Sequence, residues 1–349
     1  MSISNSLRIL SPALLLAACT DASITTEDEL SNDEQAVESQ MRWNRATGCA
    51  ISIAVAPDNT IWVVGCESSA DGNIWYMQIK DVPGELVTEE VWTMTNGRAH
   101  RVVVDNGGEP EGVTNAGAVL FNRVTTKNVG GKAIFMPGLN WKTVSPEIPR
   151  FPCVMDLGVI HLENYMLFHT EDRQERDHSY YSLRCPSSRG NGIFMWIDEQ
   201  PNQDVSQVQW TPTSQLAKSL AFFAPSQLAD QSLGKAPWIL DSDGRMWSNI
   251  PGTNQFTSQT TTPTLAIGLT DHFALASGGV YEWSDAGRGS WTRVIENTTP
   301  TGTITQIARS GAVAVQIPDG SYKTVGPSAL WAIDNTGAIY WASQSGVIH

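Results

Sequence analysis

Long apolar runs are almost absent from this 349-residue sequence, and positive charge is scarce. Lys and Arg number 22 against 36 Asp and Glu, which gives a formal net charge of −14. Residues 41–349 carry −8 of that charge and form no basic stripe, so the composition argues against a nucleic-acid partner. The clearest apolar run, Ile9–Ala18, is too short to stay in a bilayer as a spanning helix.

That run has the form of a secretory signal, because one charged residue, Arg8, precedes it and small residues end it. The segment Leu16–Cys19 (LAAC) resembles a bacterial lipobox, in which the cysteine becomes the lipidated first residue. The resemblance implies a signal peptide over 1–18 and a lipid anchor at Cys19. The alternative is an ordinary cleavage site with an incidental cysteine. Thr20 follows instead of the Asp that retains such proteins at the inner membrane, so an outer-membrane or cell-surface location is expected.

Residues 19–40 lack the composition of a folded segment. Between Thr20 and Gln40 there are seven acids and no Lys or Arg. So much charge with so few apolar groups cannot support a core. We therefore expect an acidic, solvated tether between the lipidated cysteine and a folded domain at 41–349.

Cysteine is also scarce, with five in the chain. Apart from the lipobox cysteine an even number remains, which in an exported protein favours disulfides. Cys49 and Cys66 lie almost symmetrically about a Pro-Asp-Asn turn at 57–59, so we expect them to face each other across a hairpin. Cys153 and Cys185 then pair by elimination. Zinc is the alternative, but no Cys-x-x-Cys or His partner occurs at ligand spacing.

Sustained helical periodicity is absent from residues 41–349, and short alternating runs bounded by turn residues predict strands throughout. Ile51–Gly65, for example, alternates, turns at Asp58-Asn59 and alternates again, as a β-hairpin does. A Gly followed three or four residues later by Trp recurs along the chain, and in one degenerate unit Phe135 takes the place of that Trp. The recurring residues are Trp75, Trp196, Trp247, Trp283 and Trp341, and the units begin at Trp43, Trp92, Trp141, Trp210, Phe256 and Trp291.

This repeat predicts an all-β fold, a β-propeller of six four-stranded blades. Each unit is a small sheet that cannot bury both faces alone, and radial packing covers those faces while leaving only short edges. Trp43 heads a strand with no unit before it, whereas the last unit ends near the C-terminus. We therefore expect the N-terminal strand to close the last blade. A pair of β-sandwiches or a β-solenoid is the alternative, although the variable unit length argues against a solenoid.

The order Trp, then a strand such as Ile51–Val64, then G-x-I-Y-x-W resembles the tectonin repeat of six-bladed propeller lectins. The last unit, with LWAIDNTGAIYW at Leu330–Trp341, matches best, and the units that begin at Trp43 and Trp210 are similar. The resemblance spans most of Trp43–Trp341. It implies a propeller, with glycan binding common in the family.

One aromatic ring at the same position of each unit would give a multivalent lectin its binding surface. The apolar face of a sugar ring packs on a flat indole or phenol ring, and several weak sites act together on a dense glycan. The alternative is that these large rings pack between blades. The candidates for carbohydrate binding are Trp75, Trp196, Trp247, Trp283, Trp341, Tyr281 and Tyr340.

Other polar segments are weaker candidates for chemistry. Phe168–Cys185 is rich in charge and His, but its alternating signs indicate a solvated loop. Asp241–Gly244 (DSDG) and Asp334–Gly337 (DNTG) resemble calcium loops, yet they lack the later carboxylate and lie where a hairpin needs positive φ, so we expect turns. Ser284–Trp291 resembles a sialidase-type Asp box, which braces a propeller turn. Three further histidines, His100, His161 and His272, lie singly in or beside predicted strands.

Catalytic fingerprints of serine hydrolases, zinc proteases, phosphate loops and dinucleotide sites are absent, and nothing points to a cofactor or a metal. We therefore expect a monomeric lipoprotein whose function is to bind glycan or polysaccharide without catalysis. Two alternatives stay open. One is a protein-interaction scaffold that uses the charged insertion, and the other is a propeller enzyme, a lyase or hydrolase acting on polysaccharide.

Overall fold

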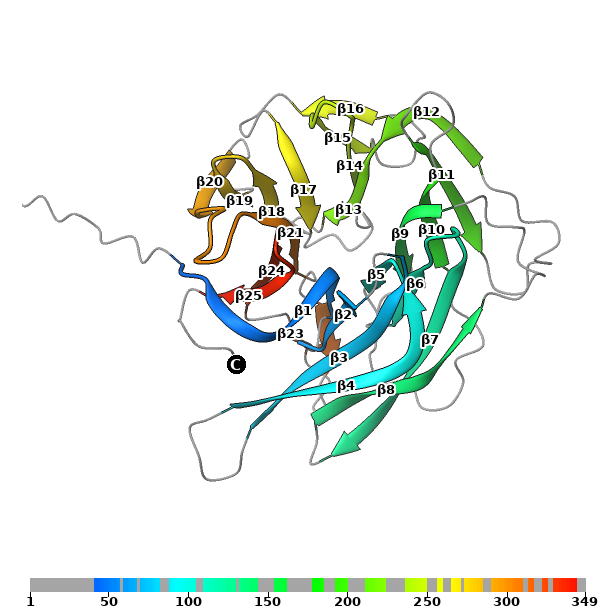
Figure 1. Ribbon diagram of the computed structural model, residues 1–349. Helices are drawn as coiled ribbons and strands as arrows, with labels where there is room; N and C mark the ends of the chain where they lie inside the picture. Colours follow the sequence, from blue (N-terminus) through cyan, green and yellow to red (C-terminus); the bar gives the residue numbers. More distant parts are fainter. Residues whose placement is uncertain are drawn as a thin grey trace, which may run out of the picture. The chain divides into compact units, whose positions relative to one another are not determined.

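The computed structural model is all-β (Figure 1). The chain divides between Glu38 and Ser39, and every described residue belongs to the second part, so the predicted signal peptide, Cys19 and tether lie outside the described residues. Within the described part, no helix is long and apolar enough to cross a membrane. The structure describes residues 41–343 except for 57–58, 68–69, 82–87, 105–108, 130–131, 144–153, 162–177, 185–191, 200–210, 224–235, 250–255, 260–264, 271–272, 285–289, 310–312, 317–321 and 326–328.

Four of the sheets are four-stranded antiparallel meanders, in which each strand pairs with the next strand in the sequence (Figure 1). The strands are β5 (Arg101–Val104), β6 (Pro110–Val113), β7 (Val119–Val129) and β8 (Lys132–Thr143); β9 (Val154–His161), β10 (His178–Arg184), β11 (Gly192–Glu199) and β12 (Thr211–Ala217); β13 (Ser219–Phe223), β14 (Ala236–Leu240), β15 (Met246–Asn249) and β16 (Phe256–Gln259); β17 (Ala266–Thr270), β18 (Phe273–Ala276), β19 (Gly279–Ser284) and β20 (Ser290–Ile295). Short turns join some of these neighbours directly, as between β6 and β7 and between β18 and β19.

The N-terminal and C-terminal strands lie in one seven-stranded sheet. Its strands, in spatial order, are β21 (Ile304–Ala308), β24 (Leu330–Asp334), β25 (Ala338–Ala342), β1 (Asn44–Val55), β2 (Ile61–Gly65), β3 (Gly72–Asp81) and β4 (Thr88–Ala99). A separate hairpin of β22 (Val313–Gln316) and β23 (Tyr322–Val325) falls between β21 and β24 in the sequence.

Strand β1 belongs to two meanders at once (Figure 1). Its first half pairs with β25, as at Asn44 opposite Trp341, and its second half pairs with β2, as at Val55 opposite Ile61. We call the meander of β21, β24, β25 and the first half of β1 the last meander. The meander of the second half of β1 with β2, β3 and β4 is the first meander. As the sequence predicted, the N-terminal strand completes the last unit.

The turn between β24 and β25 is built by Asp334. Its Oδ1 accepts hydrogen bonds from the backbone amides of Thr336, at 2.9 Å, and Ala338, at 3.0 Å, while Gly337 takes a φ of +85°. Burial raises the pKa of the Asp334 carboxyl, but hydrogen bonds from Thr301 and Thr336 outweigh burial and hold that pKa below its ordinary value of 3.8. The ionised carboxylate is therefore part of the turn.

Asp241 builds the corresponding turn between β14 and β15. Its Oδ1 accepts from the backbone amides of Asp243 and Arg245, both at 2.9 Å, and Gly244 takes a φ of +81°. Both calcium-like segments are therefore hairpin turns, as predicted, and their carboxylates are occupied by amides of the turn itself. Among the described residues, no group of three or more His, Cys, Asp or Glu side chains could hold a metal ion.

The core lies between successive meanders. One buried cluster joins Val63 of the first meander to Ile333 of the last, and another joins Phe273 of β18 to Tyr340 of β25. Every residue of β2 and of β24 is buried. A strand with both faces covered reads as a nearly continuous apolar run, as LWAID does in β24.

Four of the aromatic residues that open units lie in the fourth strand of the preceding meander, namely Trp92 in β4, Trp141 in β8, Phe256 in β16 and Trp291 in β20. The sequence unit is therefore displaced by one strand from the sheet, which explains the extra N-terminal strand. Phe135 was predicted to take the place of the recurring Trp, which lies in the third strand of the other meanders, but Phe135 lies in the fourth strand β8, so that prediction was wrong. The turn glycine before the third strand β7 is Gly117, with a φ of +80°, and the third-strand aromatic that follows it is Phe121.

The first strands of successive meanders contact one another, and polar side chains connect them. On β9, buried Asp156 accepts from Arg101 Nε of β5 at 2.5 Å and from the Leu220 amide of β13 at 3.2 Å. The Val102 amide of β5 donates to Ser52 Oγ of β1 at 3.1 Å. Other connections among the described residues are Lys218 Nζ to the Ala266 carbonyl at 3.4 Å, the Arg309 amide to Thr270 Oγ1 at 3.0 Å, and Gln306 Nε2 to the Ile53 carbonyl at 3.2 Å.

Candidate ligand pocket

A cavity of about 280 Å³ lies where β1 passes from the last meander to the first. Both meanders contribute to its wall, because Ile339 comes from β25 and the indoles come from β3 and β4. We call it the junction cavity. The residues that matter for its chemistry are Cys49, Cys66, Glu67, Trp75, Trp92 and Ile339.

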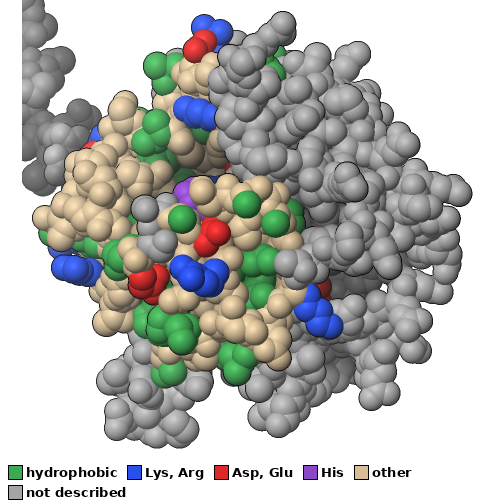
Figure 2. Space-filling model, turned by 45° about the vertical axis from the view of Figure 1, so that its right-hand side comes forward, with side chains coloured by type: hydrophobic (Ala, Val, Ile, Leu, Met, Phe, Trp, Pro, Cys, Tyr) green, Lys and Arg blue, Asp and Glu red, His purple; other side chains and the backbone are tan. Residues whose placement is uncertain are grey.

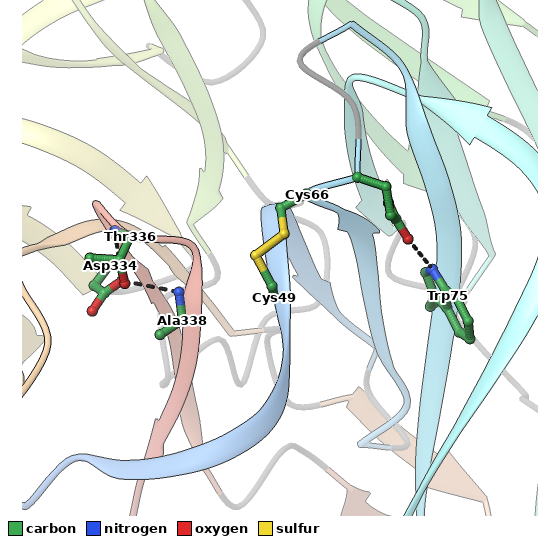
Figure 3. Close-up of a disulfide and its surroundings, with 7 residues drawn as sticks. Cys49, Cys66, Trp75, Asp334, Thr336 and Ala338 are labelled. Atoms are coloured by element: carbon green, nitrogen blue, oxygen red, sulfur yellow. Dashed lines mark hydrogen bonds between the residues drawn. A yellow bond between two sulfur atoms is a disulfide. The ribbon is translucent and has the colours of Figure 1, made fainter.

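The disulfide between Cys49 and Cys66 forms part of this wall (Figure 3), and it confirms the predicted pairing. It joins β1 to the residue that directly follows β2, with 5.6 Å between the two Cα atoms. Cys49 is the last residue of β1 that pairs with β25, and the next residue, Ala50, pairs with β2. The covalent link therefore lies at the point where β1 changes partner. Cys153 and Cys185 lie outside the described residues.

Glu67 brings a carboxylate to the junction cavity. Its Oε1 accepts a hydrogen bond from Trp75 Nε1 at 3.2 Å, drawn as a dashed line in Figure 3. The Glu67 side chain folds back over Gly65, where a Cβ atom would overlap the carboxylate group. Glu67 is exposed, and no ion pair joins it to any residue in the described part of the chain. The absence of a side chain at 65 therefore gives the carboxylate its position beside the indole.

Trp92 is held by a hydrogen bond to a residue of the last meander. Its Nε1 donates to Thr47 Oγ1 of β1 at 3.0 Å, so the hydrogen bond crosses from the first meander to the last. Trp75 and Trp92 are both half-buried and pack on the same apolar cluster. Each indole is therefore anchored at its nitrogen while part of its ring remains accessible.

The other predicted carbohydrate-binding residues are dispersed over the sheets. Trp247 is half-buried, and its Nε1 donates to Asp241 Oδ2 at 3.0 Å. Trp283 is half-buried against Trp291, with 5.3 Å between ring centroids. Tyr281 is also half-buried. None of these residues lines the junction cavity.

Two C-terminal candidates differ from each other in exposure. Trp341 is half-buried on the cluster that also supports Trp75. Tyr340 has no exposed surface, and its hydroxyl lies 2.6 Å from Thr301 Oγ1. Alternation along β25 explains the difference, because successive side chains point to opposite faces of a sheet. Tyr340 therefore presents no ring face to a sugar. Trp196 lies in β11, and its side chain is not among those that the structure describes.

The residues considered for catalysis do not form a described site. His100 is exposed, with Nδ1 3.3 Å from the Ala70 carbonyl oxygen. His161 ends β9 and pairs with His178 through the backbone, while His272 lies outside the described residues. Most of the charged insertion at 168–185 and of the Asp-box-like segment at 284–291 also lies outside them. On the face drawn in Figure 2, the described Lys and Arg side chains are scattered and form no patch.

The sequence analysis identified some of the residues that line the cavity and missed others. Trp75 was a predicted binding residue, and Trp92 was noted only as the start of a unit. Glu67 and Thr47 were not singled out, because their roles depend on the passage of β1 between two sheets. The one sequence feature that could have pointed to Glu67 is its place directly after a predicted disulfide cysteine.

No protein-family model matches the chain, and no curated protein matches its sequence. Solved structures with a similar backbone include AofleA from Arthrobotrys oligospora, 10% identical over 89% of this chain and 88% of that one, with a TM-score of 0.44. A fungal lectin from Aleuria aurantia, whose structure is described as a six-bladed β-propeller that recognises fucose, is 11% identical over 88% and 99%, with a TM-score of 0.42. YCF48 from Cyanidioschyzon merolae is 14% identical over 87% and 99%, with a TM-score of 0.38. These values are too low to assign this chain a family or a ligand.

Proposed function

We propose that this chain is a lipoprotein that binds carbohydrate, without catalysis, through a closed six-bladed β-propeller. The observation that carries the proposal is the junction cavity, where two half-buried indoles and one carboxylate lie together. Sugar rings have apolar faces that pack on indoles, and their hydroxyl groups donate to carboxylate oxygens. The cavity is close to the lower end of the range for small-molecule sites, about 300 Å³, so it takes one sugar residue and leaves the rest of a glycan outside.

Ring closure is supported by the double role of β1. The strand supplies the fourth strand of the last meander and the first strand of the first meander, and with the other four meanders this makes six blades. Hydrogen bonds reach the second half of β1 from both neighbours, from the Val102 amide of β5 and from Gln306 Nε2 of β21. A ring closed in this way leaves few unpaired strand edges.

Glycan-array binding by the full chain, folded under oxidising conditions, tests the proposal. We expect retention on one class of glycan, and we expect Trp75→Ala to abolish it, because the indole is a wall of the cavity. Trp283→Ala is the matched control: it removes another third-strand tryptophan that lies outside this cavity. Thermal unfolding of each variant verifies folding.

The result also separates the remaining hypotheses. If Trp283→Ala weakened binding as much as Trp75→Ala, the sites would be spread over the blades rather than concentrated at the junction. If folded parent protein retained no glycan, carbohydrate binding would be excluded, and a search for protein partners of residues 168–185 would come next.

The lipid anchor is tested separately, because it depends on Cys19 alone. Expression in a bacterial host should give an N-terminal peptide that begins at Cys19 and carries the mass of acyl chains. Cys19→Ser should move the protein from the membrane fraction to the soluble fraction. An unmodified N-terminus at another residue would show that the cysteine is incidental.

A further inference from the structure

We propose that the junction cavity selects sugars that carry a free, protonated amine, and that Glu67 is the residue that recognises the ammonium group. This inference rests on the proposed carbohydrate-binding function and specifies its ligand. Glu67 and Asp241, an acid in another meander, differ in the hydrogen-bond partners of their carboxylate oxygens.

Glu67 and Asp241 both bind the indole nitrogen of a third-strand tryptophan. Asp241 Oδ2 accepts from Trp247 at 3.0 Å, and Glu67 Oε1 accepts from Trp75 at 3.2 Å. The second oxygen of Asp241 holds two backbone amides of its turn, so that acid is fully explained by local structure. Within the described residues, the Trp75 indole is the one hydrogen-bond partner of Glu67. The second oxygen of Glu67 is therefore available to a ligand in the cavity.

The surroundings of Glu67 favour a cation. The described residues that line the cavity include no Lys, Arg or His, so no side chain there neutralises the carboxylate. The whole chain is acidic, with a formal net charge of −14, and its field attracts cations and repels uronic or sulfated sugars. A neutral sugar offers the carboxylate only hydroxyl donors and leaves its charge uncompensated, whereas an ammonium group forms a charge-assisted hydrogen bond with it.

The two indoles add to the same preference. A cation near the face of a Trp ring is attracted by the quadrupole of that ring, and Trp is the strongest of the aromatic side chains in this respect. Trp75 and Trp92 are both fixed at their nitrogen atoms, so little side-chain freedom is lost when a ligand enters. The same faces pack on the C–H groups of the sugar ring. An amino sugar thus uses every group that the cavity offers.

Titration calorimetry with matched oligosaccharides tests this inference. The full chain would be titrated with glucosamine and N-acetylglucosamine oligomers of equal length and linkage, near pH 6, which is below the ordinary pKa range of an amine. We expect the free-amine oligomer to bind about tenfold tighter, a difference of about 1.4 kcal/mol. Because both partners are charged, the difference should shrink as salt is added.

Two variants identify the residue responsible. Glu67→Gln keeps the size and the acceptor oxygen but removes the charge, so the preference should be lost while the acetylated oligomer binds as before. Gly65→Ala keeps the charge but adds a Cβ that displaces the flexible Glu67 side chain, so it should reduce the preference too. Asp243→Asn removes one exposed carboxylate from another meander and should leave the preference unchanged.

The outcomes separate this inference from the proposed function. Equal binding of the two oligomers by the parent protein, or an unchanged preference in Glu67→Gln, would overturn amine recognition and leave carbohydrate binding in place. Failure of the folded parent protein to bind any sugar, on the array or by calorimetry, would overturn both.

Discussion

The indole Nε1 of Trp141 donates a hydrogen bond to Thr95 Oγ1 at 2.9 Å, and this bond joins the outer strands of two successive meanders. Trp92 and Thr47 form the same contact one unit earlier, at 3.0 Å. Trp43 donates to a backbone carbonyl just after β20, at 2.7 Å. Trp43, Trp92 and Trp141, three of the tryptophans that open sequence units, therefore connect neighbouring sheets.

Loss of the Thr95 hydroxyl should destabilise the protein. Besides accepting from Trp141, Thr95 Oγ1 donates to the Ile74 carbonyl at 2.8 Å and accepts from the Gly97 amide at 3.2 Å. Thr95→Val keeps the shape but leaves three polar groups without this partner, so we expect the free energy of unfolding to fall by roughly 1–3 kcal/mol. Urea denaturation measures it. Thr93→Val on the same strand is the control, with an expected change within about 0.5 kcal/mol; equal losses would contradict the role of Thr95.

The Asp334 turn should make stability depend on pH. Its pKa in the folded protein is below the ordinary value of 3.8, so the ionised carboxylate stabilises the fold above that pH. This contribution is lost as the pH falls from 3.8 through the lower, folded-state pKa. We therefore expect Asp334→Asn to be less stable than the parent at neutral pH, and the difference to shrink as the solution is acidified below 3.8.

Unfolding free energies of the two proteins across this pH range would decide the matter. Asp243→Asn serves as the control, because Asp243 is exposed. A stability difference between the parent and Asp334→Asn that stayed constant down to the lowest pH would show that the charge of Asp334 contributes nothing.

The Cys49–Cys66 disulfide should stabilise the passage of β1 between its two sheets. The two cysteines are 17 residues apart, and a loop of this size contributes roughly 3 kcal/mol in the chain-entropy model. We expect the double variant Cys49→Ser, Cys66→Ser to lose about that amount in urea denaturation, and to lose glycan binding because the disulfide is a wall of the cavity. A variant as stable as the parent would show that strand pairing alone holds β1.

A second disulfide is predicted between Cys153 and Cys185. The strand residues next to them, Val154 and Arg184, are cross-strand partners in β9 and β10. In the same way, Ala50 and Gly65, which are next to the disulfide-bonded Cys49 and Cys66, are cross-strand partners in β1 and β2. Mass spectrometry of unreduced peptides should recover 153 linked to 185. Free thiols at both positions after oxidative folding would contradict the pairing.

The sequence predicted two parts of the candidate site, Trp75 and the disulfide, and did not predict Glu67. Trp75 was identified because it belongs to a repeated Gly–Trp pattern, which can be recognised in the sequence alone. Tyr340 was chosen by the same logic, yet it is buried, because adjacent strand residues face opposite sides of a sheet and the sequence does not show which side another sheet covers. Glu67 was missed because it belongs to no repeat, and its role appears only when Gly65 and Trp75 are placed around it.

The sequence by itself determined the local structure of this protein. The hairpins follow from alternation and from turn residues such as Asp334 and Gly337, whose hydrogen bonds and positive φ involve only a few neighbouring positions. The sequence also predicted that the N-terminal strand completes the last meander, but only the tertiary structure decided that β1 changes partner between Cys49 and Ala50, because its two partners, β25 and β2, are about 280 residues apart in the chain. The junction cavity forms at that passage between sheets, where residues from both ends of the repeat meet.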